Sequence, residues 1–359
     1  MGGQATPSPS NPVAAVLASR RLPSLPRLND PELRSRFAVA DRIFSIAELE
    51  AYRRCPLQYF FRYHLRLRPE EDGANSRVQE TLLRHVLRRY HRRSTPYADS
   101  TARRDGLQQI LTQTLDKARL DTGPHRLRLM HRLIGDALDA HLDREDRFGP
   151  LFGMASAHNH LTFGSPTAGE DAASTPEPLQ LTDADGTQVL VSGSLDRVDL
   201  DSTGQRALFL TYRLDAAPDL ADIQRGASLQ LPLGLLALEQ LFGYHAAAAC
   251  FDAAPQAGRP RLFRTEHVNL RAFSPVLPHD NGRTVTPLNR QQYTEIVENA
   301  AAAARNAARG IRSARIEAAP GDHCGRCHYT DVCRTTRLGL HDGELSLAPN
   351  FSAVTNPAG

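Results

Sequence analysis

The sequence predicts an α+β (α/β) protein in which a mixed β-sheet is flanked by helices. Two observations predict this class. Helical periodicity fills the first half of the chain, and short runs rich in β-branched and aromatic residues follow from about residue 158, with helical segments between and after them. A chain of 359 residues with 41% apolar content is also long enough to bury a hydrophobic core.

Changes in composition along the chain predict its division into segments. The N-terminal residues are rich in Pro, Ser and Arg and lack periodicity, which indicates a flexible arm. We expect one large domain after it, built from a basic helical region, a sheet core and a cysteine segment, and then a short tail. The expected bounds are 1–43 for the arm, 44–338 for the domain (44–150, 155–312 and 313–338 for its three parts) and 339–359 for the tail.

The first helices are predicted by capping and proline signals. Ser45 and Glu48 stand at the spacing of a capping box, so a helix is expected to begin there, with order starting near Phe44. This helix should end at Cys55, because Pro56 follows directly and can open a second helix in LQYFFRYHLRL. Leu, Ile and Val at three- and four-residue intervals predict further helices over 77–93, 102–121 and 125–146.

The sheet is predicted by short β-rich runs between turn signals. Runs at 158–163, 188–200 and 205–214 indicate an antiparallel arrangement, and DSTG at 201–204 has the composition of a turn. The Pro- and Ala-rich stretch at 165–178 is expected to be a mobile loop. The remaining predicted elements are a helix over 222–242, strands over 244–251 and 261–270, and an Ala-rich helix over 290–311.

Charge and hydropathy exclude several classes of protein. The net charge is only +3, so attraction to nucleic acid would depend on local clustering. Lys117 is the only lysine and does not follow a glycine-rich loop, so we expect no ATP binding in this chain. The sequence shows no apolar stretch of membrane-spanning length and no secretory signal, which predicts a cytoplasmic protein with no membrane partner.

Three of the five cysteines crowd together near the C-terminus with the spacing C-x2-C-x5-C. In a reducing compartment such thiols are typical ligands of zinc or of an iron–sulfur cluster, and either centre needs a fourth ligand. His323 or His328 could complete a zinc site locally, whereas Cys55 could complete an all-thiolate site from far away. The three clustered cysteines are Cys324, Cys327 and Cys333.

Two segments together resemble the RecB/AddB-type PD-(D/E)XK exonuclease family. They are YRRCPLQYFF at 52–61 and CGRCHYTDVCR at 324–334. The resemblance implies a restriction-endonuclease-like core and a [4Fe–4S] cluster that pins the C-terminal segment against the N-terminal helices. The resemblance does not include Cys250 among the cluster ligands. Cys250 lies in an apolar run and is expected to be a buried core thiol. The implied cluster ligands are Cys55, Cys324, Cys327 and Cys333.

The resemblance also implies a Mg²⁺-dependent active site, which can be inspected motif by motif. Asp196 in GSLDRVDL stands at the first metal-binding position, and Gln230 keeps the family glutamine. The Asp-Tyr-Lys motif is replaced by Thr211-Tyr212-Arg213, so a neutral hydroxyl stands where Mg²⁺ needs a carboxylate, and a planar guanidinium stands where Lys would position water. Other positions depart too: Arg84 replaces the family His, Glu80 its Gly, and Gly234 its Tyr.

These departures predict a degenerate active site, with two alternatives left open. An active Mg²⁺-dependent exonuclease could use relocated ligands, for which Asp199, Asp201 and Asp215 are near in sequence, and His85 could take over the role of the family His. A third possibility is a structural scaffold without affinity for DNA. Metal-dependent cleavage that requires Asp196 separates the active from the degenerate site, and DNA affinity that falls with salt separates DNA binding from the scaffold alternative.

A basic region predicts where DNA would bind. Residues 52–93 hold eleven Arg against four acidic residues, a local net charge of +7. Aromatic residues interleave with them and could stack on bases, although Phe60 and Phe61 are also core candidates. The expected partners are DNA, as single strands or ends, and a helicase or nuclease protein. The DNA-binding candidates are Arg53, Arg54, Arg62, Arg88 and Arg89.

Overall fold

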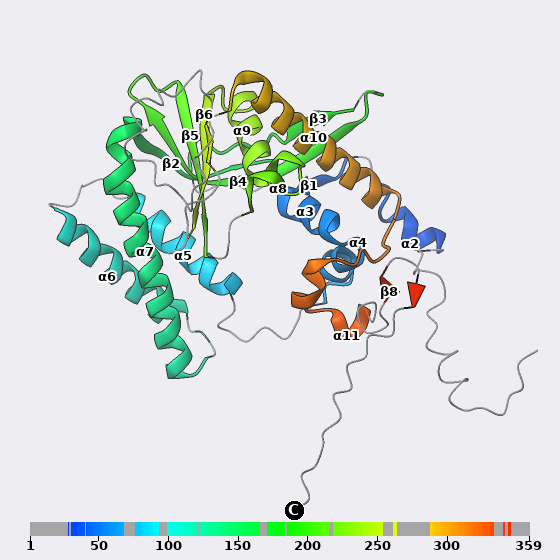
Figure 1. Ribbon diagram of the computed structural model, residues 1–359, viewed down its shortest axis with the longest axis horizontal. Helices are drawn as coiled ribbons and strands as arrows, with labels where there is room; N and C mark the ends of the chain where they lie inside the picture. Colours follow the sequence, from blue (N-terminus) through cyan, green and yellow to red (C-terminus); the bar gives the residue numbers. More distant parts are fainter. Residues whose placement is uncertain are drawn as a thin grey trace, which may run out of the picture.

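A computed structural model gives the arrangement of most of the chain (Figure 1). The residues that it describes are Leu28, 30–39, 41–67, 76–92, 99–118, Leu120, 122–165, 171–183, 185–214, 218–253, 261–263, 288–333, 340–341 and 344–345.

A mixed sheet lies at the centre of the fold, as the sequence predicts. Its longest strand, β4, pairs in antiparallel fashion with β2, β3 and β5 and in parallel with the short β1. β5 and β6 run parallel, which requires a crossover, and two short helices supply it. The strands are β1 (Ile43–Ser45), β2 (Met154–Phe163), β3 (Leu179–Thr182), β4 (Gln188–Asp201), β5 (Arg206–Arg213), β6 (His245–Ala253) and β7 (Arg261–Phe263).

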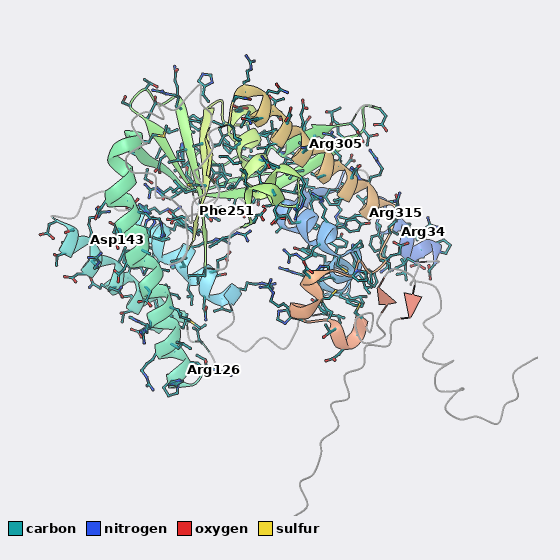
Figure 2. All side chains as sticks on the ribbon, in the orientation of Figure 1. Arg34, Arg126, Asp143, Phe251, Arg305 and Arg315 are labelled. Carbon is teal, nitrogen blue, oxygen red and sulfur yellow. The ribbon has the colours of Figure 1, made fainter. Side chains whose placement is uncertain are left out.

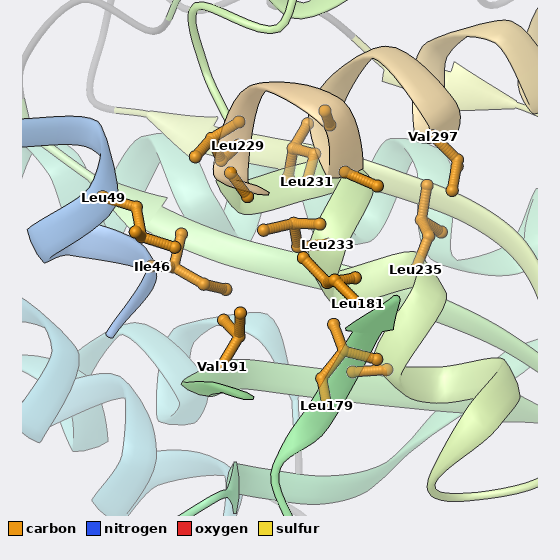
Figure 3. Close-up of a cluster of buried hydrophobic side chains, with 14 of the residues drawn as sticks. Ile46, Leu49, Leu179, Leu181, Val191, Leu229, Leu231, Leu233, Leu235 and Val297 are labelled. Atoms are coloured by element: carbon orange, nitrogen blue, oxygen red, sulfur yellow. The ribbon is translucent and has the colours of Figure 1, made fainter. Parts of the chain in front are cut away.

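One side of the sheet packs on helices from both ends of the domain. α3 (Ile46–Arg54), α9 (Gln230–Gln240) and the long α10 (Arg290–Arg312) cover this side, and α8 (Leu220–Gln224) precedes α9 in the crossover. Leu231 and Leu233 of α9 reach toward Leu181 and Val191 of the strands (Figure 3). Burial of this apolar surface is the main stabilising contribution to the core.

A second helical layer carries its own apolar cluster. α5 (Ser76–His91), α6 (Ser100–Ala118) and α7 (Pro124–Phe152) pack against one another and against Tyr212 of β5. Leu87, Leu111 and Ile134 are almost fully buried between them. Because the side chains of a strand alternate, Tyr212 faces this bundle while its neighbours Thr211 and Arg213 point the other way.

The cysteine-bearing segments form a third packed region. α4 (Pro56–Tyr59) follows α3 directly and continues as a π-helix (Phe60–His64). A 3-10 helix (Asp322–Arg326) and α11 (Thr330–Cys333) lie against these elements, where Phe61 contacts Tyr329. The described ends of the chain add α2 (Pro31–Ser35) and a pair of two-residue strands, β8 (Leu340–His341) and β9 (Glu344–Leu345).

Several elements differ from the expectation in their bounds. The helix expected over 222–242 is broken, because Gly226 adopts a positive φ of 68° and separates α8 from α9. The second helix is α-helical only to Tyr59, after which Leu65 N–H donates to the carbonyl of Phe60, five residues back. Ser45 does cap α3, but the Glu48 side chain accepts from the Tyr59 hydroxyl and does not complete a capping box.

The structure also contains order where the sequence suggested none. α2 and the buried Phe37 lie within the stretch expected to be a flexible arm. In the expected mobile loop, Glu177 accepts a hydrogen bond from Gly164 N–H, and Asp171 accepts one from Asn159 N–H. Cys250 is partly exposed rather than buried. Residues 1–27, 264–270 of the expected last strand and 346–359 of the tail lie outside the described residues.

Among the described residues, no helix combines the length and apolarity needed to span a bilayer. The sides of the fold carry many charged side chains instead, among them Asp143 on α7 and Arg305 on α10 (Figure 2).

His64 predicts a pH dependence of stability. Its ring stacks on Phe37 at 3.9 Å and its Nε2 lies 3.1 Å from the Tyr59 hydroxyl. Burial, and then the nearby charge of Arg42, lowers the pKa of His64 from 6.5 to about 4. The unfolded chain therefore binds this proton more readily, and stability present above pH 6.5 is lost as the pH falls toward 4.

We expect His64→Gln to flatten the loss of stability between pH 6.5 and pH 4, measured as urea midpoints across that range. His125→Gln, at an exposed position on α7, is the matched control and should leave the slope unchanged. Equal slopes for the wild type and His64→Gln would contradict the assignment.

Candidate functional site

Three segments bring the sequence-predicted nuclease positions together. β4 supplies Asp196, the adjacent β5 supplies Thr211 and Arg213, and α9 supplies Gln230 at its first residue. The Gln230 amide donates to Thr211 Oγ1 at 2.8 Å, and Arg213 Nη2 donates to Gln230 Oε1 at 3.0 Å. The side chains of Thr211 and Arg213 thus share one face of β5, as strand alternation predicts.

The start of α9 is fixed from α3. Glu50 Oε1 accepts hydrogen bonds from the backbone N–H of Leu229 at 2.7 Å and of Gln230 at 3.2 Å. A carboxylate at a helix N-terminus satisfies N–H groups that have no partner inside the helix. The role of Glu50 could not be predicted from the sequence, because the contact spans about 180 residues and no local pattern indicates it.

Asp196 is buried, with 7% of its surface exposed, and three donors converge on one oxygen. Its Oδ2 accepts from Thr211 Oγ1 at 2.9 Å and from Tyr212 N–H at 2.9 Å, and Arg84 Nε lies 3.2 Å away. A metal ion would have to displace these donors to bind that oxygen.

Arg84 of α5 extends to the end of β5, where its guanidinium lies between two carboxylates. Its guanidinium pairs with Glu80 at 2.6 Å as well as with Asp196, and it donates to the carbonyl of Tyr212 at 3.1 Å. Arg84 therefore supplies a positive charge to the side chain that the family uses for metal binding. Glu80 stands at the family's glycine position, so both partners of this ion pair are departures from the family motif.

Around Gly234 there is no room for the family tyrosine. A Cβ at this position would lie 2.6 Å from Phe209 Cε1 and 3.1 Å from Leu195 Cδ2, both in the buried core. Any larger side chain would clash with Phe209. A tyrosine at this position would therefore require α9 to pack differently on β5.

Two of the three carboxylates that could supply a relocated site form ion pairs or hydrogen bonds elsewhere. Asp199 pairs with Arg197 at 2.5 Å, and Asp201 accepts from the Thr203 hydroxyl and from Arg206. His85 is exposed on α5. Asp215 lies outside the described residues.

The four expected cluster cysteines line one small pocket. Cys55 is buried at the junction of α3 and α4, and the other three come from the C-terminal segment. Burial raises the pKa of the Cys327 thiol, and the charges of the other three thiols raise it further, as expected for sulfurs held close together. Besides the cysteines, the pocket is lined mainly by apolar groups such as Leu57, Phe61 and Ala318.

The residues of this pocket fit a metal centre made from thiolates. Four sulfurs of soft-ligand character line one pocket, with Cys55 buried and the other three partly exposed, and such a donor set is that of an all-cysteine cluster. His323 also lines the pocket, with Nε2 3.8 Å from Cys324 Sγ, so the zinc alternative keeps a local fourth ligand. Tyr329 ties the segment to the N-terminal helices by donating to the carbonyl of Leu67 at 2.9 Å.

The five arginines predicted to bind DNA differ in their surroundings. Arg54 and Arg62 are exposed, and Arg62 lies over the ring of Tyr63. Arg89 donates to Gln113 and Thr114 of α6, and Arg88 is partly buried on α5. Of the expected stacking residues, Tyr59 and Phe61 are buried in the core and are wrong as base-stacking candidates.

Arg53 lines an open groove of about 590 Å³ between α3 and α10. The groove also contains Arg225 and two asparagines of α10, Asn299 and Asn306. Arg53 Nη1 is buried and makes no hydrogen bond among the described residues. Burial lowers the pKa of Arg53, although its ordinary value is so high that the side chain stays charged.

Comparison with known proteins agrees with this geometry. The chain is similar to an ATP-dependent helicase/deoxyribonuclease component from Desulforudis audaxviator (strain MP104C), with 28% identity over 273 residues. The similarity covers 70% of this chain and 22% of that relative, so the chain spans about a fifth of the relative's length. A family model of the PD-(D/E)XK nuclease superfamily matches residues 43–334. The mixed sheet, the grouped motif positions and this match over most of the sequence together establish that the chain belongs to the PD-(D/E)XK nuclease superfamily.

Proposed function

We propose that this chain is a catalytically inactive PD-(D/E)XK domain that binds DNA, carries a [4Fe–4S] cluster on its four grouped cysteines, and acts with a helicase or nuclease partner. The observation that carries the loss of catalysis is the ion pair of Arg84 with Asp196.

The chemistry of the donor set supports this proposal. Mg²⁺ prefers several oxygen ligands with carboxylates among them, and it activates a water for attack on a phosphate. Around Asp196 the described neighbours are hydroxyl, amide and guanidinium donors, which compete with a cation for the same oxygen. Arg213 cannot give up a proton, and its guanidinium is held by Gln230 rather than free to orient water. The residues present therefore do not fit Mg²⁺.

The decisive experiment compares cleavage of labelled single- and double-stranded DNA in Mg²⁺ or Mn²⁺. We expect the wild type to show no more cleavage than Asp196→Ala, because the metal position is already satisfied by protein groups. The triple variant Arg84→His/Thr211→Asp/Arg213→Lys restores the family residues at these three positions and is expected to gain cleavage. Wild-type cleavage that disappears in Asp196→Ala would favour the alternative of an active exonuclease with relocated ligands.

DNA binding is supported by the groove beside Arg53. The charged, partly exposed guanidinium of Arg53 lines the groove and is suited to a phosphate oxygen, and two asparagines across the groove can bond to sugar or phosphate. A volume of about 590 Å³ is within the range of small-ligand sites and accommodates part of a nucleotide strand. Arg54, exposed one position later, extends the positive surface.

We expect Arg53→Gln to weaken binding of single-stranded DNA several-fold and to lower the slope of log affinity against log salt concentration by about one. Fluorescence anisotropy at several salt concentrations measures both. Arg128→Gln, an exposed position on α7 outside the groove, is the matched control. Wild-type protein without salt-dependent affinity would favour the scaffold alternative.

A partner helicase is proposed from the relative alone. That protein's name includes a helicase activity, and this chain matches about a fifth of its length. The only lysine, Lys117, does not belong to a phosphate-binding loop, so ATP-driven unwinding would come from elsewhere. Co-purification of a tagged chain from its native cells, followed by an ATP-dependent unwinding assay, tests this part.

A further inference from the structure

Two helices of the second helical layer bring together three metal-ligating side chains. His91 comes from the end of α5, and His141 and Glu145 stand one turn apart on α7. The Nε2 atoms of the two histidines lie 3.1 Å apart, and Glu145 Oε1 lies 3.9 Å from the first and 3.7 Å from the second. In Figure 2, Asp143 marks α7 and Phe251 marks the strand β6 that faces it.

The two imidazoles approach each other through their Nε2 atoms, which lie 3.1 Å apart. His141 Nδ1 is hydrogen-bonded to the Asp252 carboxylate. His91 Nε2 accepts a hydrogen bond from Arg197 Nη1 at 3.0 Å. A metal ion bound by both rings would replace the direct contact between the two Nε2 atoms.

The three distances match the ligand spacing of a transition-metal ion. A point equally far from atoms with these separations lies about 2.1 Å from each, which is the usual length of zinc bonds to imidazole nitrogen and carboxylate oxygen. Asp252 on the far nitrogen of His141 is the outer carboxylate that commonly orients a metal-binding histidine. Two imidazoles and one carboxylate suit Zn²⁺ rather than Mg²⁺.

We propose that His91, His141 and Glu145 form a binding site for a divalent transition metal of the Zn²⁺ type, which braces α5 and α7 separately from the nuclease position. Its fourth ligand is water.

Metal binding at this site would require a charged side chain, that of Arg197, to move. Arg197 Nη1 contacts both Glu145 Oε1 and His91 Nε2, and an incoming ion would displace it from these two ligand atoms. The guanidinium keeps two other bonds, to Asp199 at 2.5 and 2.9 Å, so Arg197 stays anchored after that shift. Glu145, Asp199 and Asp252 against Arg103, Arg144 and Arg197 leave no net local charge before an ion enters.

Cobalt(II) titration of the full-length protein, with its cysteine centre intact under anaerobic conditions, tests the site. We expect uptake of one equivalent with d–d absorption bands and no thiolate-to-cobalt charge-transfer band, followed by displacement with Zn²⁺. His141→Gln and Glu145→Gln should each weaken binding by at least about 100-fold. His131→Gln, on α7 and bonded only to Thr112 among the described contacts, is the matched control and should bind as the wild type does.

Two outcomes would overturn the proposal. One is a folded wild-type protein that takes up no cobalt beyond the cysteine centre. The other is uptake that persists in both variants or that shows thiolate charge-transfer bands, because the ion would then sit elsewhere. Neither outcome depends on nuclease activity or on DNA binding, so the cobalt titration tests the metal site independently of the proposed function.

Discussion

Cys55→Ser is expected to remove the iron and to lower the free energy of unfolding by about 5 kcal/mol. Cys55 and Cys324 are roughly 270 residues apart, and a link between them removes much of the conformational freedom of the unfolded chain. Ser fits the buried junction of α3 and α4 but is not a soft ligand. Iron content, about four per chain in the wild type, and urea unfolding under anaerobic conditions measure the two effects.

Cys250→Ser is the matched control for this experiment. Cys250 lies on β6, away from the cysteine pocket, so the same substitution there should leave the iron in place. Retention of four irons by Cys55→Ser, or stoichiometric zinc in a colourless wild type, would contradict the cluster. The zinc result would point to His323 as the local fourth ligand.

Arg197→Met is expected to cost about 3–5 kcal/mol of stability, because it leaves buried carboxylates without their partner. Arg197 is 8% exposed and Asp199 5% exposed, so water cannot replace the lost pairing. Glu145 loses a contact in the same change. Urea unfolding at neutral pH measures the loss as a lower midpoint at unchanged slope.

A double substitution separates the unpaired charge from lost packing. In Arg197→Met/Asp199→Leu both partners become apolar, so most of the lost stability should return. Arg104→Met is the surface control: Arg104 pairs with Asp139 and Asp143, but all three are well exposed, so the expected cost is below about 1 kcal/mol. A loss in Arg197→Met no greater than in this control would show that the network adds little.

The fold class could be predicted because its signals are local. Leu, Ile and Val at helical spacing located α5, α6 and α7, and the runs around Asp196 and Thr211 located β4 and β5. Interruptions of helices and very short strands were harder to predict. Gly226 interrupts an otherwise continuous apolar pattern, and β1 is only three residues long and exists through its pairing with β4.

The candidate site was predictable only in part, for a physical reason. The sequence motifs identified Asp196, Thr211, Arg213 and Gln230 as site residues, and hydrogen bonds connect these side chains in the structure. The partners that decide their chemistry come from contacts made in space. The pairing of Arg84 with Asp196 joins residues more than a hundred positions apart, and His91 meets His141 from a different helix. Without tertiary contacts, His91 and His141 look like ordinary helical residues, and the partner of Arg84 cannot be predicted.

Helix α3 has a consequence for any redesign of this protein. It carries Glu50, which fixes the first residue of α9, and it ends at Cys55. Glu50 and Cys55 are five residues apart, about 7.5 Å along the helix axis, so the two positions are joined by a short, rigid helical segment. A tilt imposed at the sulfur end would be transmitted to Gln230. The geometry of the cysteine pocket and that of the nuclease position are therefore linked through α3. Moving either site into another protein would require α3 to be moved with it.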